Sequence, residues 1–379
     1  AAAGETRIEA PGPTRDHTER MLASAGVAIH RSGTVTNAFY WANRFHDATY
    51  LLGFTEQARN FQHDNFGRGG VGGDRFSIEV QDSSGTNNAN FTTGADGTRG
   101  RLQLYVWTGP TPDRDGALDR SVVIHELGHA VSKRLIGNGT GPTGNWGGAL
   151  GEGWSEFIAL TLFATPAEPV DGIYPVGAYS TYLLQPGFVS NNYYGIRRFP
   201  FAIRSVTGGP SNRPHAPQTF ADTVLSQFDI SDGAFPPGPV SPPVDGIHSR
   251  GEIWALALLE ARARLIARHG YAEGNRRMLQ YVFDGMKLTP LTPTFLDARD
   301  AILAAREQAG GVIERAQQPG DVAQRAALLA SLRQRARRFA LEVDDEGIAL
   351  RDQHLAEMEV AVHAGQQRAL RRRRQPRQQ

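Results

Sequence analysis

The chain has 379 residues, of which 40% are hydrophobic, so it is long enough to form two packed subdomains and a further tail. Its formal net charge of +1 argues against a polyanionic partner, and the absence of cysteine excludes disulfides and thiol catalysis without deciding the compartment. No apolar run approaches the roughly 18 residues of a membrane span, so we expect a soluble chain.

The first third of the chain mixes helical and strand-like segments. A helix is predicted over 37–50, and strands are predicted over 75–80 and 101–107. The chain starts with Ala1-Ala2-Ala3-Gly4, without an initiating methionine or the apolar core of a signal peptide, so we expect a processed or excised fragment. These segments predict an α/β half whose sheet ends at the helix that follows.

That helix carries an H-E-x-x-H motif, His125 to His129, and is predicted to run from Ser121 to Ile136, before a stop at 137–139. His125 and His129 are four residues apart, so both imidazoles project from one helix face and can hold one zinc ion. Glu126 lies between them, where its carboxylate can act as general base toward a water held by the metal. The alternative is two ordinary helix histidines with a glutamate between them by accident.

A catalytic zinc commonly takes three protein ligands, so the motif needs a third. Glu152 is the candidate, at the start of an apolar helix predicted over 154–164, after a Gly- and Asn-rich loop at 137–148. Glu156 follows four residues later on the same face, where it can accept the free ring N–H of a ligand histidine. The alternative for Glu152 is a carboxylate that complements the dipole at a helix N-terminus.

Helices are predicted to dominate from residue 150 onward, interrupted by Pro- and Gly-rich loops at 207–217 and 232–246. His248 is predicted to lie in a loop before a helix at 252–264. After a break at 318–320, charged helices are predicted over 323–341 and 350–364, and the chain closes on a basic run. Such a run can contact nucleic acid or anionic lipid, but a solvated terminus is the favoured interpretation.

The two motifs together resemble the fungalysin family of secreted zinc metalloendopeptidases, which are thermolysin-like zincins. The family pattern is H-E-x-x-H and then G-E-G-W, Ser or Gly, and Asp; here Gly-Glu-Gly-Trp-Ser-Glu occupies 151–156. The resemblance covers about residues 35 to 305. The other matching segments are 37–41, 46–47, 53–54, 60–62, 65–72, 85–91, 248–255, 285–288 and 293–303.

Carried over residue by residue, the resemblance implies that His125, His129 and Glu152 bind one Zn²⁺ per chain and that Glu126 is the general base. It implies that His248 hydrogen-bonds the oxyanion of the scissile carbonyl, a role that the chemistry also requires. Asp245 is expected to orient His248. The alternative for His248 is an ordinary loop histidine.

Three further residues are predicted to contact the substrate. Asn88 and Ala89 resemble the asparagine-alanine pair at the edge strand of thermolysin-like clefts, which holds an extended peptide by β-augmentation. Ordinary turn composition is the alternative at this point. Arg197 is a weaker candidate for contacting a substrate carbonyl, and a solvated or ion-paired arginine explains it equally well.

The chain also departs from the family. Glu156 stands where the family usually has aspartate, and no tyrosine lies between His129 and Glu152 to act as a second oxyanion donor. Residues 1–34 lack the longer opening of a mature fungalysin, and the family's closing segment is not recognisable beyond about residue 310.

The predicted fold class is α+β. It is a two-subdomain zincin with an α/β N-terminal half that ends in the active-site helix, a mainly helical C-terminal half, and the cleft between them. The predicted domains are a divergent N-terminal segment at 1–34, an N-terminal catalytic subdomain at 35–140, a C-terminal subdomain with the third zinc ligand at 141–310, and a charged helical tail at 311–379, with disorder considered for its end.

The function predicted from these features is a zinc-dependent endopeptidase that hydrolyses internal peptide bonds of protein or peptide substrates. The alternatives are a catalytically silent zincin homologue that binds peptides, which the intact Glu126 argues against, and a zinc aminopeptidase. No Gly-x-Met-x-Asn string is present to capture a free substrate amine. The resemblance further implies a secreted, extracellular protein made as a zymogen with an inhibitory propeptide, and no nucleic acid partner or membrane span is expected.

Overall fold

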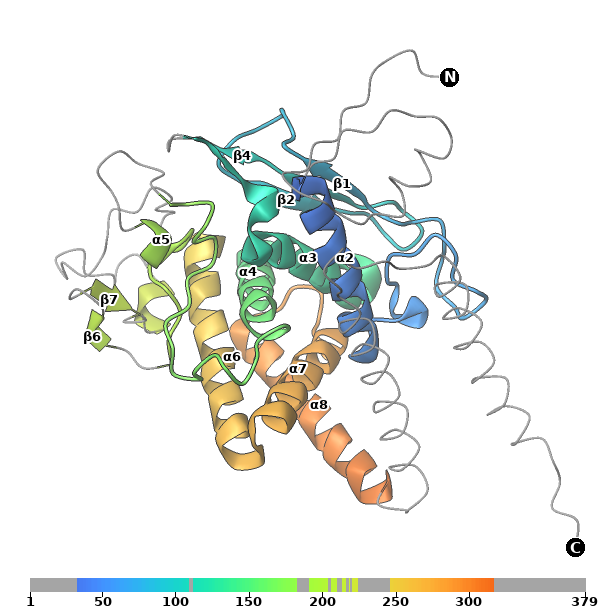
Figure 1. The fold of residues 1–379 in the computed structure, drawn as a ribbon. Coiled ribbons are helices and arrows are strands. Elements are labelled where there is room, and N and C mark those ends of the chain that lie inside the picture. Colours follow the sequence, from blue (N-terminus) through green and yellow to red (C-terminus); the bar gives the residue numbers. More distant parts are fainter. Residues whose placement is uncertain are drawn as a thin grey trace, which may run out of the picture. The chain divides into compact units, whose positions relative to one another are not determined.

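The computed structural model in Figure 1 describes residues 33–108, 112–182, 191–203, 206–209, 213–215, 218, 220–223 and 246–316. The elements from α2 to α7 and most of α8 belong to one compact unit that extends to Gln308. The fold is α+β, as predicted, with small sheets early in the unit and long helices in its later part. None of the helices described is both long and apolar enough to cross a membrane.

The early part of the unit contains helix α2 (Gly33–Leu51), which confirms the predicted helix, and a three-stranded sheet. The sheet has the order β1-β3-β2, with β3 parallel to β1 and antiparallel to β2. Its strands, and the two of a short antiparallel ribbon, are β1 (Ser77–Val80), β2 (Ala89–Thr92), β3 (Arg101–Leu104), β4 (Val106–Trp107) and β5 (Arg114–Asp115). The strand predicted over 101–107 is thus two strands, separated at Tyr105.

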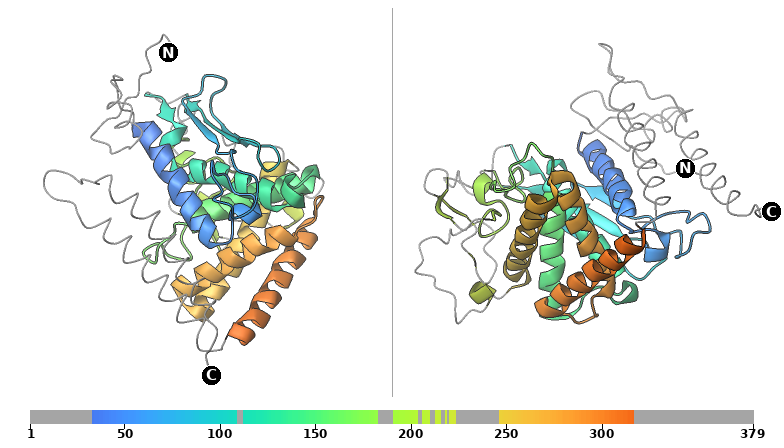
Figure 2. Two further views of the ribbon diagram at one scale, coloured as in Figure 1. Left: turned by 90° about the vertical axis from the view of Figure 1, so that its right-hand side faces the viewer. Right: turned by 90° about the horizontal axis from the view of Figure 1, so that it is seen from below.

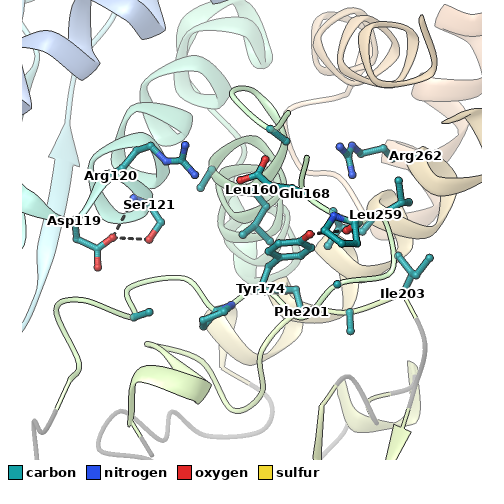
Figure 3. A pocket seen from close by; sticks show the side chains of 18 of the residues that line it. Asp119, Arg120, Ser121, Leu160, Glu168, Tyr174, Phe201, Ile203, Leu259 and Arg262 are labelled. Carbon is teal, nitrogen blue, oxygen red and sulfur yellow. Dashed lines mark hydrogen bonds between the residues drawn. The ribbon is translucent and has the colours of Figure 1, made fainter. Parts of the chain in front are cut away.

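Helix α3 (Arg120–Leu135) carries the H-E-x-x-H motif and is fixed at its start by a capping residue. The Asp119 carboxylate accepts the Ser121 backbone N–H at 3.0 Å and the Ser121 hydroxyl at 2.6 Å, as Figure 3 shows. Its other oxygen accepts the Ser180 N–H at 3.1 Å. The capping residue Asp119 therefore also connects the loop around residue 180 to the start of α3.

Helix α3 lies against helix α4 (Gly144–Thr161) at a glycine. A Cβ atom on Gly128 would lie 2.7 Å from the Cα atom of Ser155, closer than any side chain tolerates. The two helix backbones therefore approach closely one residue before His129. This approach brings the side chains of α4 within reach of the histidines of α3.

Glycines also allow a close contact between α4 and helix α6 (Ile247–His269). A Cβ on Gly153 would lie 2.5 Å from the Gly251 carbonyl oxygen, and a Cβ on Gly251 would lie 2.6 Å from the Glu152 Cβ. Glu152 therefore lies at a point where α4 is packed against both neighbouring helices. In the left view of Figure 2, the strands and helix α7 (Tyr271–Leu288) lie on opposite sides of α3.

The structure corrects the expected element boundaries at three places. Helix α4 starts at Gly144 and ends at Thr161, so the glycines expected in a loop lie inside it and Glu152 lies well beyond its first turn. Helix α6 starts at Ile247, so His248 lies in its first turn and not in a preceding loop. The loop expected at 207–217 contains parts of strands β6 (Val206–Gly209) and β7 (Arg213–His215), which pair antiparallel.

The physical reason at α4 is packing. A Cβ on Gly148 would lie 2.9 Å from Ile247, so tertiary contacts favour glycine in this helix although glycine has low helix propensity. The remaining elements are α5 (Asn191–Tyr194), α8 (Phe295–Ala316) and 3-10 turns at Glu56–Ala58, Gly116–Leu118, Gly137–Gly139 and Phe220–Thr223. The helices predicted over 323–341 and 350–364, the break at 318–320 and most of the 232–246 loop lie outside the described residues.

Candidate active site

Three side chains of α3 converge on one point, as the motif spacing predicts. One potential ligand atom from each of His125, Glu126 and His129 lies within 4.8 Å of the other two. The Nε2 atoms of His125 and His129 are 3.1 Å apart, and the two rings are nearly perpendicular at 86°. Both imidazoles therefore present a nitrogen to the same small volume, as ligands of a single ion would.

Glu152 reaches this point from α4. Its Oε2 atom lies 3.3 Å from His125 Nε2, and its Oε1 atom lies 3.5 Å from His129 Nε2. Tetrahedral ligands at the usual zinc distances of about 2.0–2.2 Å lie roughly 3.3–3.5 Å from one another. The two nitrogens and the Glu152 carboxylate therefore fit a zinc ion. Glu126 also lies close to both histidines.

The charges around this point shift several pKa values. Burial lowers the pKa of His129 to about 3, so its ring is neutral and able to act as a ligand at neutral pH. Burial and the nearby Glu152 carboxylate raise the pKa of Glu126 to about 7, although the charge of His125 acts to lower it. Although burial opposes it, the hydrogen bond and charge of His125 and the charge of the Arg197 guanidinium hold the pKa of Glu152 well below its usual range. Glu152 is therefore the ionised carboxylate of the pair.

Glu156 and Arg197 lie behind the ligands. Glu156 is fully buried, and its Oε1 atom lies 3.5 Å from His125 Nδ1, the ring nitrogen that faces away from the metal point. Arg197 donates from Nη2 to Glu152 Oε2 at 3.0 Å, and its Nε atom contacts Glu156 Oε1. The structure thus places Arg197 as a buried partner of both carboxylates, the ion-paired interpretation that the sequence left open.

His248 approaches from the start of α6. Its Nε2 atom lies 3.4 Å from Glu152 Oε1, and its side chain is 45% exposed. The His248 imidazole therefore lies next to the Glu152 carboxylate and can still contact a molecule bound in the cleft. Asp245, predicted to orient it, lies outside the described residues.

A cleft of about 720 Å³ is lined by His125, Glu126, His129, Glu152, Arg197 and His248, among other residues. Its walls come from β2, α3, α4 and the start of α6. Asn88 and Ala89 lie at the rim formed by β2, so the structure brings these two candidates to the same cleft as the histidines. A wall residue that sequence reasoning missed is Lys133, whose position seven residues after Glu126 on one helix face would have revealed it.

A second cavity, of about 300 Å³, lies near the start of α3 (Figure 3). Tyr174, Leu160 and Leu259 contribute to its wall, which also includes the charged side chains of Glu168 and Arg262, all labelled in Figure 3. None of the described residues that line it is a histidine.

Comparison with known proteins gives consistent matches. The sequence pattern of the family described as fungalysin metallopeptidase matches residues 17–317. An extracellular metalloproteinase of Pyricularia oryzae is 37% identical over 298 residues, which are 73% of this chain and 41% of the relative. A probable extracellular metalloproteinase 4 of Arthroderma benhamiae is 35% identical, covering 75% of this chain and 42% of the relative. An extracellular metalloproteinase of Aspergillus fumigatus is 34% identical over the same shares. The chain thus spans about two fifths of the length of these relatives.

Proposed function

The chain belongs to the fungalysin metallopeptidase family, and from this premise we propose that it is a zinc-dependent endopeptidase that hydrolyses internal bonds of protein or peptide chains. The observation that carries the proposal is the convergence of His125 Nε2, His129 Nε2 and the Glu152 carboxylate, at separations of 3.1 to 3.5 Å, at the base of an open cleft. We assign these three side chains as the ligands of one zinc ion. When bound, zinc polarises the scissile carbonyl and lowers the pKa of the attacking water.

Glu126 acts as the general base in this proposal. It is 7% exposed and lies beside both histidines, and its pKa of about 7 suits a group that takes and returns a proton near neutral pH. A bound cation would lower that value and favour the ionised form. Glu126 accepts a proton as the water oxygen attacks the carbonyl carbon, and it gives the proton to the departing amine as the C–N bond breaks.

Glu156 and Arg197 position the ligands. A ligand histidine usually donates its second ring N–H to a carboxylate, which fixes the tautomer and the ring orientation. Glu156 is placed to accept that proton from His125 Nδ1. Arg197 balances the charge of Glu152 and Glu156 inside the protein, which two buried carboxylates require. Contact of Arg197 with a substrate carbonyl stays a prediction.

His248 stabilises the oxyanion in this proposal, because its half-exposed ring borders both the cleft and Glu152. Asn88 and Ala89 hold the substrate main chain along the rim of the cleft. The division of the chain at residues 34, 140 and 310 stays a prediction. The relatives are named extracellular, so we infer that this chain also acts outside the cell. An inhibitory propeptide in its precursor stays a prediction.

Cleavage of an unstructured protein tests the endopeptidase assignment. Because residues of β2 line the cleft and an extended peptide can pair with such a strand, we expect internal bonds to be cut and new termini to appear throughout the substrate from the earliest time points. Mass spectrometry of the products after brief digestion measures this. Release of single residues from the amino terminus alone would identify an aminopeptidase, and an intact substrate would point to a silent homologue.

A further inference from the structure

Lys133 of α3 lies beside strand β2 and has no role in the proposed reaction. Lys133 lies in the last turn of α3, and its Nζ atom donates a hydrogen bond to the Phe91 carbonyl oxygen at 2.6 Å. Its aliphatic stem lies against Gly141, where an added Cβ would meet the Lys133 Cγ at 3.3 Å. The ammonium group is thus held at one end of the cleft, between α3 and the β2 rim.

The strand register shows which groups of β2 face the cleft. Within the described residues β2 pairs only with β3, so it is an edge strand. The Tyr105 N–H donates to the Asn88 carbonyl, so the peptide groups of residue 88 point toward β3. Because these directions alternate in an antiparallel pair, the N–H and C=O groups of Ala89 and Phe91 point to the open side.

Lys133 forms a hydrogen bond with one of the backbone groups of β2 that point to the open side. A peptide that pairs with β2 can use the N–H and C=O of Ala89 and the N–H of Phe91, but the Phe91 carbonyl is already bonded to the ammonium. Main-chain pairing therefore stops at Phe91. The substrate residue that reaches this point meets a positive charge in place of a hydrogen-bond acceptor.

No described carboxylate contacts the Lys133 ammonium, although the charges of Glu126 and Glu152 in the same cleft act on it. An ammonium group has three donors, and only the bond to Phe91 is observed. Among the described residues no carboxylate forms an ion pair with it, whereas Arg197 in the same cleft is paired with both Glu152 and Glu156. Lys133 is half-buried, and a charge in that setting is stabilised by an anionic group that approaches it.

We propose that Lys133 is a specificity-determining residue that ends the pairing of the substrate with β2 at Phe91 and favours a substrate carboxylate at that position. The carboxylate is an Asp or Glu side chain or the free carboxyl terminus of the substrate. The inference rests on the proposed peptidase function and extends it to the class of substrate. It also predicts that Lys or Arg is disfavoured at the same position, because like charges repel.

The test uses synthetic peptides with one scissile bond, in which each position on both sides carries Asp, Asn or Lys in turn. For the unaltered chain we expect kcat/KM to be about fivefold higher for Asp than for Asn at one position, the order expected of a partly solvated ion pair. Peptides that end at that position as an acid or an amide separate a terminal carboxylate from a side-chain carboxylate.

Lys133→Met should bring the Asp-to-Asn ratio at that position to about one, whereas Lys133→Arg should keep it. The matched control is Lys287→Met, which alters the chain's only other lysine, paired with Asp284 on α7, and should leave the ratio unchanged. A melting curve of each variant verifies folding, and Lys133→Gln replaces Lys133→Met if the latter does not fold.

The outcomes separate this inference from the function on which it rests. If the unaltered chain cleaves the peptides without any Asp preference, or if Lys133→Met keeps the preference, the role of Lys133 is wrong and the peptidase assignment stands. If no peptide is cleaved under conditions where zinc is bound, the peptidase assignment itself fails, and the inference with it.

Discussion

Glu126→Gln is expected to keep one zinc per chain and to lose peptide hydrolysis by a factor of about 10² to 10⁴, the usual contribution of a general base. Glutamine has nearly the same shape as glutamate but cannot accept the proton of the attacking water. The substitution leaves His125, His129 and Glu152 intact, so metal affinity should change far less than turnover. Zinc content by elemental analysis and kcat on an unstructured peptide, measured on the same sample, check this expectation.

The matched control is Glu168→Gln, the same substitution in the second cavity of about 300 Å³, and it should leave both quantities unchanged. Near-normal turnover of Glu126→Gln with zinc bound would remove Glu126 as the base. Loss of zinc together with activity would instead place Glu126 among the ligands, which its position within 4.8 Å of both histidines permits.

The second large effect concerns the two carboxylates of α4. Glu152→Gln is expected to abolish tight zinc binding, because the Glu152 oxygens lie 3.3 and 3.5 Å from the two ligand nitrogens. Glu156→Gln is expected to keep the zinc and to weaken affinity or rate by about 10- to 100-fold, the usual effect of removing the partner of a ligand histidine. Both glutamates contact Arg197, so each variant disturbs one buried ion pair and the two are fair controls for each other.

Zinc titration monitored by a competing chelating dye distinguishes the two variants, and a melting curve in excess chelator reports the metal-free stability of each. Both should melt at lower temperature than the unaltered chain, because Arg197 loses a buried partner. The ligand assignment moves by one turn of α4 if Glu152→Gln binds zinc normally and Glu156→Gln binds none.

The sequence predicted those parts of the site that depend on spacing within one helix. His125, Glu126 and His129 converge because residues separated by about one turn share a face, and no tertiary contact is needed for that conclusion. The helix that became α2 was also predicted, because its pattern is local. The edge strand at Ala89 was expected only from the family resemblance, since the local composition there is that of a turn. The comparisons confirm the resemblance to the fungalysin family. That resemblance suggested the roles of the remaining candidate site residues, such as His248.

The sequence could not predict features that depend on close approach between helices. Gly128, Gly153 and Gly251 have low helix propensity, yet each lies where a side chain would collide with a neighbouring helix. Local propensity therefore placed the start of α4 too late and left His248 in a loop. The pairing of Arg197 with Glu152 and Glu156 joins positions more than 40 residues apart, and local pattern carries no information about it.

The central claim is that this chain hydrolyses peptide bonds by means of one zinc ion held by His125, His129 and Glu152. The most direct test removes the metal from the chain with a chelator, returns zinc in measured steps, and records bound zinc and cleavage of an unstructured protein at each step. We predict that cleavage disappears with the metal and returns in proportion to zinc, reaching its full value at one ion per chain. Cleavage that persists in the metal-free chain, or that stays absent when one zinc is bound, would contradict the account.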